Sequence, residues 1–421
     1  MTDSPRRGSL LVIFLTVFID LLGFGIVLPL LPVYGKEFAR SAGESGAEVG
    51  VMLGLLMASF SIMQFLFAPF WGRISDRIGR RPVLMIGLLG SVIFYTLFGI
   101  ATVMKSLPLL FVARIGAGLA GATIPVSHAY IADTTTKETR TKGMALVGAA
   151  FGLGFTFGPL FGLLAVPTGT GDPGPGPGYA AAALSAFALV LAYFKLPESL
   201  PEGGQVTKRR IFNFQSVSDA LATPTIGLLL VTMFVCVLAF ASFESTLSVL
   251  IRDEQGAFAF SYRELCLTFA FIGAVLTVVQ GGLVRRLAGR VSDAMLATAG
   301  TLVSVVGFLF LARAGETGSL GMLWGALTTV VTGFAFITPS LNSLISRRSD
   351  PAKQGSIMGV AQSISSLARI VGPIAGLMLF HLQPPSSASW PLWLAAALML
   401  GGLGMVVLAA RGGKDYVAAT E

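Results

Sequence analysis

The sequence predicts an all-α membrane protein whose twelve transmembrane helices form two parallel six-helix repeats. First, 54% of its 421 residues are hydrophobic and only 12% are charged, which is about half the charged share of a soluble domain. Second, the apolar residues gather in stretches long enough to cross a bilayer. Third, sequence landmarks recur at a nearly constant distance. Stretches such as LLVIFLTVFIDLLGFGIVLPLLPVY do not alternate between apolar and polar residues, which argues against a β-barrel.

Each predicted span contains about 20 residues, the length that a helix needs to cross the hydrocarbon core. The first span is too long for the core of a signal peptide and has no small-residue cleavage pattern behind it, so we expect it in the mature protein. The twelve spans are predicted at residues 10–34, 49–71, 82–104, 108–131, 143–166, 179–196, 224–249, 263–284, 294–312, 319–345, 356–381 and 390–410.

The distribution of lysine and arginine predicts the orientation in the membrane. With the N-terminus inside, most basic residues fall in cytoplasmic segments, and the opposite side holds only Lys36, Arg40, Lys105, Arg252, Arg263 and Arg313. We therefore expect a multi-pass protein of the cell (inner) membrane with both termini in the cytoplasm. Because the basic residues are spread over the inner loops, topology explains the net charge of +8, and no nucleic-acid partner is expected.

The chain is predicted to divide into an N-terminal six-helix half (1–197), a cytoplasmic central loop (198–222) and a C-terminal six-helix half (223–421). GRISDRIGR begins at residue 72 and GLVRRLAGR at residue 282, 210 positions later (282 − 72). GPLFG at 158 and GPIAG at 372 are 214 positions apart (372 − 158), as are Pro125 and Pro339. An even number of spans per half gives parallel repeats, whose interface exposes a central site to each side in turn. This architecture favours transport.

Four motifs resemble those of a known family, the major facilitator superfamily. GRISDRIGRR (72–81) resembles its loop signature between spans two and three, and FVARIGAG (111–118) resembles the arginine motif of its fourth span. GAAFGLGFTFGPLFG (148–162) is similar to the fifth-span motif of its antiporters. DLLGFGIVLPLLP (20–32) resembles the first span of its drug:proton antiporter group, which includes the tetracycline exporters. The resemblance implies the major facilitator fold and a secondary active transporter that exports a small lipophilic drug-like compound or metabolite in exchange for protons.

The loop signature is expected to act as a gate. Its acid, Asp76, stands among arginines and adds nothing to cytoplasmic retention, so it suggests a specific partner. The resemblance implies that Asp76 faces the N-terminal end of span eleven near residues 355–357, and that Arg80 engages Asp133 at the end of span four. These contacts would hold the inner ends of the two halves together. The expected gating residues are Gly72, Asp76, Arg77, Gly79, Arg80, Arg81 and Asp133.

Two charges inside the first half are candidates for proton coupling. Asp20 lies about eleven residues into span one, and Arg114 lies about 10 Å into span four at 1.5 Å per residue. Because the two spans run in opposite directions, Asp20 and Arg114 lie at similar depths in the membrane. Arg114 is therefore expected to pair with a deprotonated Asp20 in one state of the transporter. From spacing alone a static ion pair is an equal alternative; the resemblance favours coupling.

The fifth-span motif supplies small residues at four-residue spacing, which let neighbouring helices approach closely. Its proline introduces a local bend. The resemblance associates this motif with antiporters, and its residues are Gly148, Gly152, Gly154, Gly158, Pro159 and Gly162.

Other intramembrane polar residues could line a substrate cleft, although such residues more often join neighbouring helices. Glu244 and Arg369 form a candidate pair, for which a structural role is favoured over a second proton site. The possible cleft residues are Gln64, Glu244, Gln280, Asn342, Gln362 and Arg369.

Several other functions are disfavoured. Two histidines and two cysteines are too few for a metal site, no nucleotide-binding loop occurs, and no catalytic constellation marks an enzyme. We expect no cofactor, a proton gradient as the driving force, and a monomer whose partners are the substrate, protons and the lipid bilayer. A proton symporter or uniporter for a sugar or organic acid remains the alternative. Phe94 stands where tetracycline exporters carry an acid, so tetracycline is not favoured as the substrate.

Overall fold

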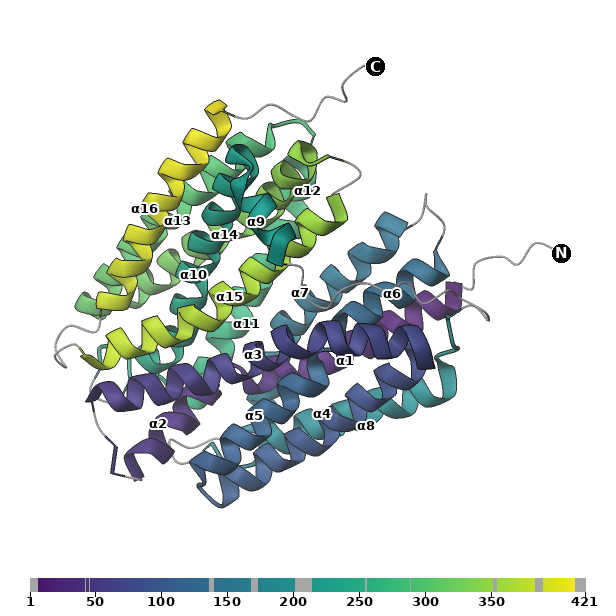
Figure 1. Cartoon of the computed structure of the whole chain (residues 1–421). Coiled ribbons are helices and arrows are strands. Elements are labelled where there is room, and N and C mark those ends of the chain that lie inside the picture. The colour runs from purple at the N-terminus through teal and green to yellow at the C-terminus, as the bar shows by residue number, and fades with distance from the viewer. Residues whose placement is uncertain are drawn as a thin grey trace, which may run out of the picture. The chain divides into compact units, whose positions relative to one another are not determined.

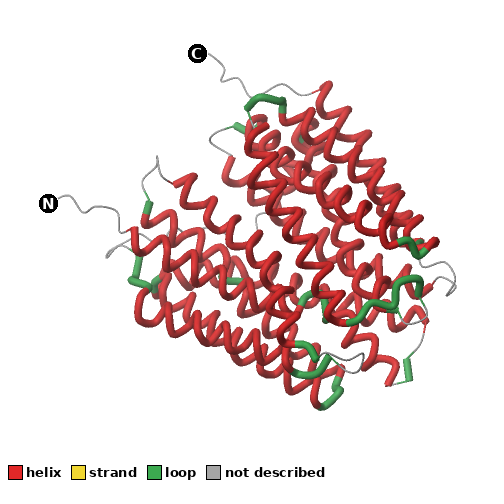
Figure 2. Tube along the Cα trace, turned by 180° about the vertical axis from the view of Figure 1, so that it is seen from behind, coloured by secondary structure: helices red, strands yellow, loops and turns green. Residues whose placement is uncertain are grey.

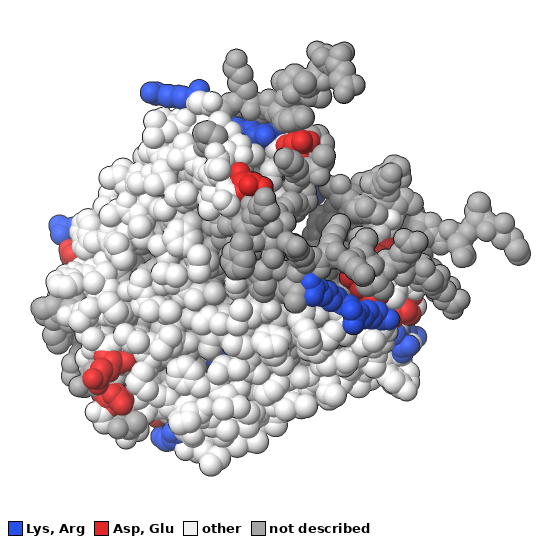
Figure 3. Space-filling view, in the orientation of Figure 1, with Lys and Arg blue, Asp and Glu red and all other residues white. Residues whose placement is uncertain are grey.

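Helices account for nearly all of the described chain, as the tube in Figure 2 shows. The computed structural model describes residues 7–41, 43–44, 46–135, 140–167, 173–200, 214–253, 256–287, 289–350, 354–382 and 389–412. Eleven spans within these ranges are long and apolar enough to cross a membrane, and Ala149–Ala165 is a shorter apolar helix. The predicted all-helical class is confirmed, and the helices are consistent with twelve spans. On the face shown in Figure 3 most of the surface is neither basic nor acidic, as expected for a protein in lipid.

The helices follow the predicted spans in order (Figure 1). The first half contains α1 (Arg7–Val27), α2 (Leu31–Ser41), α3 (Gly46–Ile78), α4 (Arg80–Val103), α5 (Leu107–Gly121), α6 (Ile124–Thr134), α7 (Arg140–Ala165) and α8 (Gly176–Lys195). The second half contains α9 (Phe214–Ala222), α10 (Pro224–Arg252), α11 (Tyr262–Val278), the π-helical turn η1 (Val279–Val284), α12 (Arg285–Leu287), α13 (Asp293–Thr317), α14 (Leu320–Arg348), α15 (Gln354–Leu382) and α16 (Trp390–Gly412).

Three spans differ from the prediction. Span one ends at Val27 and is followed by the separate helix α2. Span four is broken between Gly121 and Ile124. Span eight contains the π-helical turn η1 where the second copy of the loop signature begins. Hydrophobicity predicts that these segments cross the membrane but does not reveal where the helix is interrupted.

The chain forms two compact units. Unit 1 consists of residues Met1–Glu44, Ser59–Ile211 and Ser261–Gly273, and unit 2 consists of Ser45–Ala58, Phe212–Phe260 and Ala274–Glu421. Each unit therefore contains most of one half and a short segment from the other half.

The same helix pairs pack together in each half. In the first half, α1 packs on α7 and α8, and α4 packs on α5 and α8. In the second half, α10 packs on α15 and α16, and α13 packs on α14 and α16. In terms of span order these are identical pairings, so the repeated landmarks of the sequence correspond to a repeated packing arrangement.

Glycines of the repeated GPxxG motif explain one of these pairings. A Cβ at Gly158 of α7 would lie 2.6 Å from the Cα of Gly25 in α1. A Cβ at Gly372 of α15, 214 positions later, would lie 2.8 Å from the Cβ of Ala241 in α10. Because real Cβ atoms do not approach other atoms so closely, both positions need glycine for the helices to pack at this distance.

Candidate functional site

Span four, which carries the candidate arginine, consists of two helices. Ser106 begins α5 by accepting a hydrogen bond from Leu109 N over 3.4 Å. The helix ends at Gly121, and α6 begins at Ile124 with Pro125 in its first turn. Proline has no N–H to donate to the carbonyl four residues earlier, so Pro125 leaves the carbonyl of Gly121 without its helical donor. The proline therefore accounts for the missing backbone hydrogen bond at the break.

Side chains of α3 compensate for the break. Gln64 Nε2 donates to the carbonyl of Gly121 over 3.2 Å, and Trp71 Nε1 donates to the carbonyl of Leu119 over 2.8 Å. A backbone carbonyl without a partner is costly within a membrane, so these two bonds stabilise the interrupted span. Gln64 was expected among the possible cleft residues; the structure shows its amide bonded to the helix backbone.

Arg114 of α5 is buried against aromatic rings. It is 2% exposed, and its guanidinium carbon lies 4.7 Å from the ring centre of Phe60 and 5.9 Å from that of Phe24, an arrangement that stabilises a cation. Its Nε and Nη1 have no hydrogen-bond partner among the described residues. One turn later, a Cβ at Gly118 would lie 2.6 Å from the carbonyl oxygen of Phe60, so this glycine lets α5 approach α3.

Asp20 of α1 lies near the same cluster. The hydroxyl of Ser91 lies near its side chain, and its Oδ1 is buried without a partner in the described part of the chain. Tyr95 of α4 is 4% exposed and lies within range of the charges of both Asp20 and Arg114. No ion pair joins Asp20 directly to Arg114 within the described residues. The two charges thus share a neighbourhood, and their role in proton coupling stays a prediction.

The fifth-span motif packs chiefly against α1. A Cβ at Gly154 would lie 2.8 Å from the Cβ of Leu21, and Gly158 faces Gly25. Gly162 faces Cys266 at 3.4 Å, within the same unit, and Pro159 lies inside α7. The carbonyl of Gly152 accepts a hydrogen bond from Thr156, and the surroundings of Gly148 lie outside the described residues. The association of the motif with antiport is not tested by this packing.

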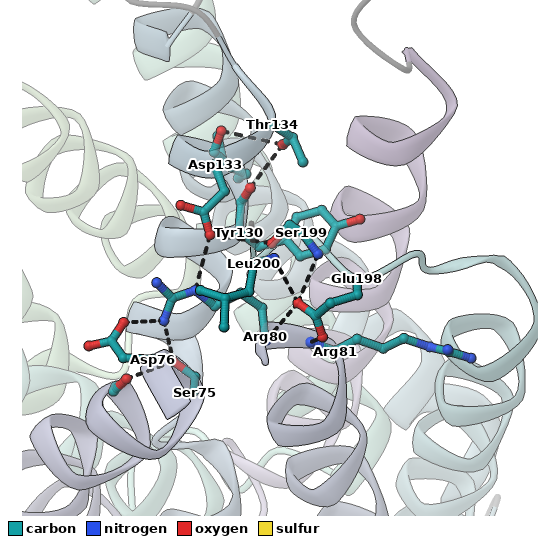
Figure 4. A network of polar contacts seen from close by, with 12 residues as sticks. Ser75, Asp76, Arg80, Arg81, Tyr130, Asp133, Thr134, Glu198, Ser199 and Leu200 are labelled. Carbon is teal, nitrogen blue, oxygen red and sulfur yellow. Dashed lines mark hydrogen bonds and ion pairs between the residues drawn. The ribbon is translucent and has the colours of Figure 1, made fainter. Parts of the chain in front are cut away.

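The expected gating residues form a network around Arg80, which Figure 4 shows in close view. Arg80 is 8% exposed, and its Nε lies 3.1 Å from Asp133 Oδ2. Its Nη1 donates to Ser75 Oγ over 2.7 Å and also to Asp76 Oδ1. The expected contact between Arg80 and Asp133 is present. Asp76 is bonded to Arg80, and its expected approach to residues 355–357 stays a prediction because the side chains of 355 and 356 lie outside the described residues.

The remaining loop residues contribute differently. Arg81 Nη2 donates to the carbonyl of Tyr193 near the C-terminal end of α8 over 2.6 Å. The carbonyl of Gly72 accepts from Ser75 Oγ over 2.7 Å, and Arg77 is exposed. Gly79 has a φ of 104°, a backbone conformation that favours glycine.

Glu198 belongs to this network and was missed by sequence reasoning. It lies directly after span six, where LPES reads as the start of a loop. Its Oε1 accepts from Arg80 N over 2.8 Å, and its Oε2 accepts from Arg81 N over 3.1 Å. An acid just past a span end, on the same side of the membrane as the loop signature, was the available signal.

The other possible cleft residues lie in unit 2. Glu244 lies within range of the charge of Arg369, which agrees with their expected proximity. Gln280 lies in η1 and is exposed, as are Gln362 and Arg369, while Asn342 is half-buried. None of these observations assigns a ligand. No group of three or more metal-binding side chains was found among the described residues.

Comparison with known proteins relates the whole chain to one family. The family model "Major Facilitator Superfamily" matches residues 13–373. The class E tetracycline resistance protein of Escherichia coli is 30% identical over 397 residues, covering 93% of this chain and 91% of the relative. The "Major facilitator superfamily domain-containing protein 10" of Mus musculus is 28% identical over 421 residues, covering 90% of this chain and 88% of the relative.

Solved structures agree with this relationship. The crystal structure of the human organic anion transporter MFSD10 (TETRAN) matches with a TM-score of 0.69 and 26% identity, covering 96% of this chain and 100% of that one. The D-xylose-proton symporter has a TM-score of 0.77 at 18% identity, covering 96% and 97% of the two chains, and shows the fold alone. The family and these neighbours indicate a multi-pass transporter of small molecules and not an enzyme. With the loop signature, the arginine of span four and the repeated helix packing, this chain belongs to the major facilitator superfamily.

Proposed function

We propose that the chain is a proton-coupled antiporter that exports a small lipophilic, drug-like compound or metabolite by alternating access. The observation that carries the proposal is Asp20, whose Oδ1 is buried without a hydrogen-bond partner among the described residues. A carboxylate inside an apolar helix is costly, and a bound proton would remove its charge. The similarity to tetracycline resistance proteins supports export of a drug-like compound.

Arg114 is the proposed counter-charge. The charges of both Asp20 and Arg114 lie within range of Tyr95. Since the three residues belong to α1, α5 and α4, a small rearrangement of these helices would change the distance between the two charges. In the proposed cycle, Asp20 releases its proton when Arg114 comes within pairing distance and takes up a proton when the two separate. Such a change in environment is what couples protonation to a conformational change.

The remaining assignments are part of the same proposal. The protein lies in the cell membrane with both termini in the cytoplasm, and the Arg80 network acts as an inner gate. The 1–197 and 223–421 halves change their relative position during transport, and Gln280, Asn342 and Gln362 are the candidate substrate contacts. Glu244 and Arg369 form a structural pair, in keeping with the influence of Arg369 on Glu244.

Proton release from inverted membrane vesicles tests the proposal. Lipophilic cations, tetracyclines, sugars and organic acids are added in turn, and an antiporter releases protons in response to its own substrate. Asp20→Asn is expected to abolish proton-driven uptake into these vesicles while preserving downhill exchange of the same substrate. Glu244→Gln is the matched control, because it neutralises a half-buried acid within a span of the other half and is expected to leave coupling intact. If Asp20→Asn kept full proton coupling, the assignment of Asp20 would be wrong.

A second candidate function is transport of organic anions. The observation that favours it is the buried guanidinium of Arg114, whose Nε and Nη1 have no partner among the described residues, because a carboxylate of the substrate could accept a charge-assisted hydrogen bond from one of these groups. The similarity to the human organic anion transporter MFSD10 (TETRAN) supports this candidate. A response to organic acids alone in the vesicle assay, lost in Arg114→Ala, would replace drug export with this function.

A further inference from the structure

The two halves begin their third spans in different ways. Ser292 accepts a hydrogen bond from Met295 N over 3.3 Å and thereby caps its own helix, α13. At the corresponding place in the first half, the residue before α4 is Gly79, which has no side chain to offer and makes no cap. The first N–H groups of a helix have no partner within it, so α4 depends on an acceptor from elsewhere.

Glu198 supplies that acceptor from the end of span six. Its carboxylate accepts from the N–H groups of Arg80 and Arg81, the first two residues of α4, over 2.8 and 3.1 Å. It also accepts from the N–H groups of Ser199 and Leu200 over 2.8 and 2.9 Å. A negative charge at a helix N-terminus is favoured by the aligned peptide dipoles. One carboxylate therefore joins the start of α4 to the start of the central loop.

Gly79 is shaped for this contact. A Cβ there would collide with the Glu198 carboxylate and lie 2.8 Å from its Cδ. Its φ of 104° is the second requirement for glycine. Gly79 therefore makes room for an acid from 119 positions away (198 − 79).

The capped residue is also the centre of the network. Glu198 holds the backbone of Arg80, and the side chain of Arg80 pairs with Asp76 and Asp133. We propose that Glu198 is a positioning residue: by capping α4 in place of its own missing N-cap, it sets Arg80 for pairing with Asp133 and ties that network to the beginning of the central loop. The consequence for transport rests on the proposed inner gate, whereas the capping itself does not.

Hydrogen–deuterium exchange on the full-length protein in detergent tests the capping. Glu198→Ala is expected to raise amide exchange in the peptide containing residues 80–84, and Glu198→Gln to raise it less, because one amide oxygen still accepts. Glu264→Gln is the matched control: Glu264 accepts from the N–H of Ser261 at the start of another helix and should leave residues 80–84 unchanged. Unchanged exchange at 80–84 in both Glu198 variants would overturn the proposal.

A double-mutant cycle tests the positioning. Asp133→Asn, Glu198→Gln and their combination are compared by midpoint of thermal unfolding and by the rate of substrate-driven proton release. If Glu198 acts through Arg80, the combined loss is clearly smaller than the sum of the single losses, because both changes act on one residue. Additive losses would reduce Glu198 to an independent helix cap and contradict positioning.

The exchange and unfolding measurements test the role of Glu198 separately from the proposed function, which is tested by proton release. If no compound in the panel drives proton release, the antiport proposal fails, while the exchange and unfolding measurements still test Glu198. If transport is observed, Glu198→Gln is expected to lower its maximal rate about threefold or more while leaving the substrate concentration for half-maximal rate within about twofold. An equal rate in Glu198→Gln and the unmodified protein would contradict the consequence for transport.

Discussion

Each half of the chain contains an ion pair between the start of its third span and the end of its fourth span, and the two charges are in opposite order. In the first half, Arg80 is the first residue of α4 and pairs over 3.1 Å with Asp133 near the end of span four. In the second half, Asp293 is the first residue of α13 and pairs over 3.4 Å with Arg347 near the end of span ten. The positions are 213 and 214 apart (293 − 80, 347 − 133), so each residue corresponds to one of opposite charge.

Because the charges are reversed, the two pairs can be compared for the contacts that they share and for the contacts that only one of them makes. Both join the start of a third span to the end of a fourth span, and that task does not depend on which partner is positive. The first-half arginine additionally binds Asp76 and is capped by Glu198. The second-half pair instead has Ser343, whose hydroxyl donates to Asp293 over 2.6 Å. The Asp76 contact and the Glu198 cap therefore distinguish the first-half pair.

Exchange of the two charges gives the largest expected effect. Arg80→Asp places a third carboxylate beside Asp76 and Asp133 and removes a buried cation, so it is expected to lower the free energy of unfolding by about 3 kcal/mol. Combining it with Asp133→Arg restores opposite charges and should recover at least half of the loss, measured by thermal unfolding in detergent. A double variant no more stable than the single variant would show that the sign of the pair matters.

The same exchange in the second half is the control. The Arg347 side chain is 56% exposed, so Asp293→Arg is expected to cost about 1 kcal/mol or less.

Alanine at the two loop glycines gives an intermediate effect. Gly79 and Gly289 both have positive φ, 104° and 79°, so alanine strains each by about 1–2 kcal/mol. A Cβ at Gly289 meets nothing within 4 Å, whereas one at Gly79 collides with Glu198. Gly79→Ala is therefore expected to lower the unfolding midpoint more than Gly289→Ala. Equal losses would indicate that Glu198 yields without cost and would weaken the contrast between the loops.

Loss of the Gln64 hydrogen bond gives the smallest effect. Gln64→Leu leaves the carbonyl of Gly121 without its donor and is expected to cost about 1 kcal/mol in unfolding free energy. Gln280→Leu in span eight is the control, because Gln280 is exposed and has no hydrogen bond among the described residues; it should change stability by less than about 0.5 kcal/mol. The comparison also distinguishes Gln64 as a helix-joining residue from a residue used only for substrate.

Hydrophobic length and motif spacing predicted the spans and the repeat, and the resemblance to the family implied the Arg80 to Asp133 contact that the structure contains. The sequence also placed Asp20 and Arg114 at similar depths. Depth, however, fixes only the position along a helix, and the direction of each side chain depends on helix packing, so the sharing of Tyr95 by both charges could not be foreseen.

Glu198 was missed because its contacts also depend on how the helices pack. Its bonds to α4 connect residues more than 100 positions apart in the chain, and no periodic pattern marks a single acid after a span. The break in span four coincides with Pro125, which is one of the repeated landmarks of the sequence. However, Pro339 at the matching place of the second half lies inside the continuous helix α14. A proline alone therefore does not decide between a break and a continuous helix.

The break in span four also places its two charged residues on two separate helices. Arg114 lies on α5, and Asp133 lies on α6. Pro125 has no N–H, and the carbonyl of Gly121 already accepts from Gln64. A change in the angle between α5 and α6 would therefore break no helical hydrogen bond at that carbonyl. The Arg80 network and the Arg114 cluster are therefore attached to separate helices of one span.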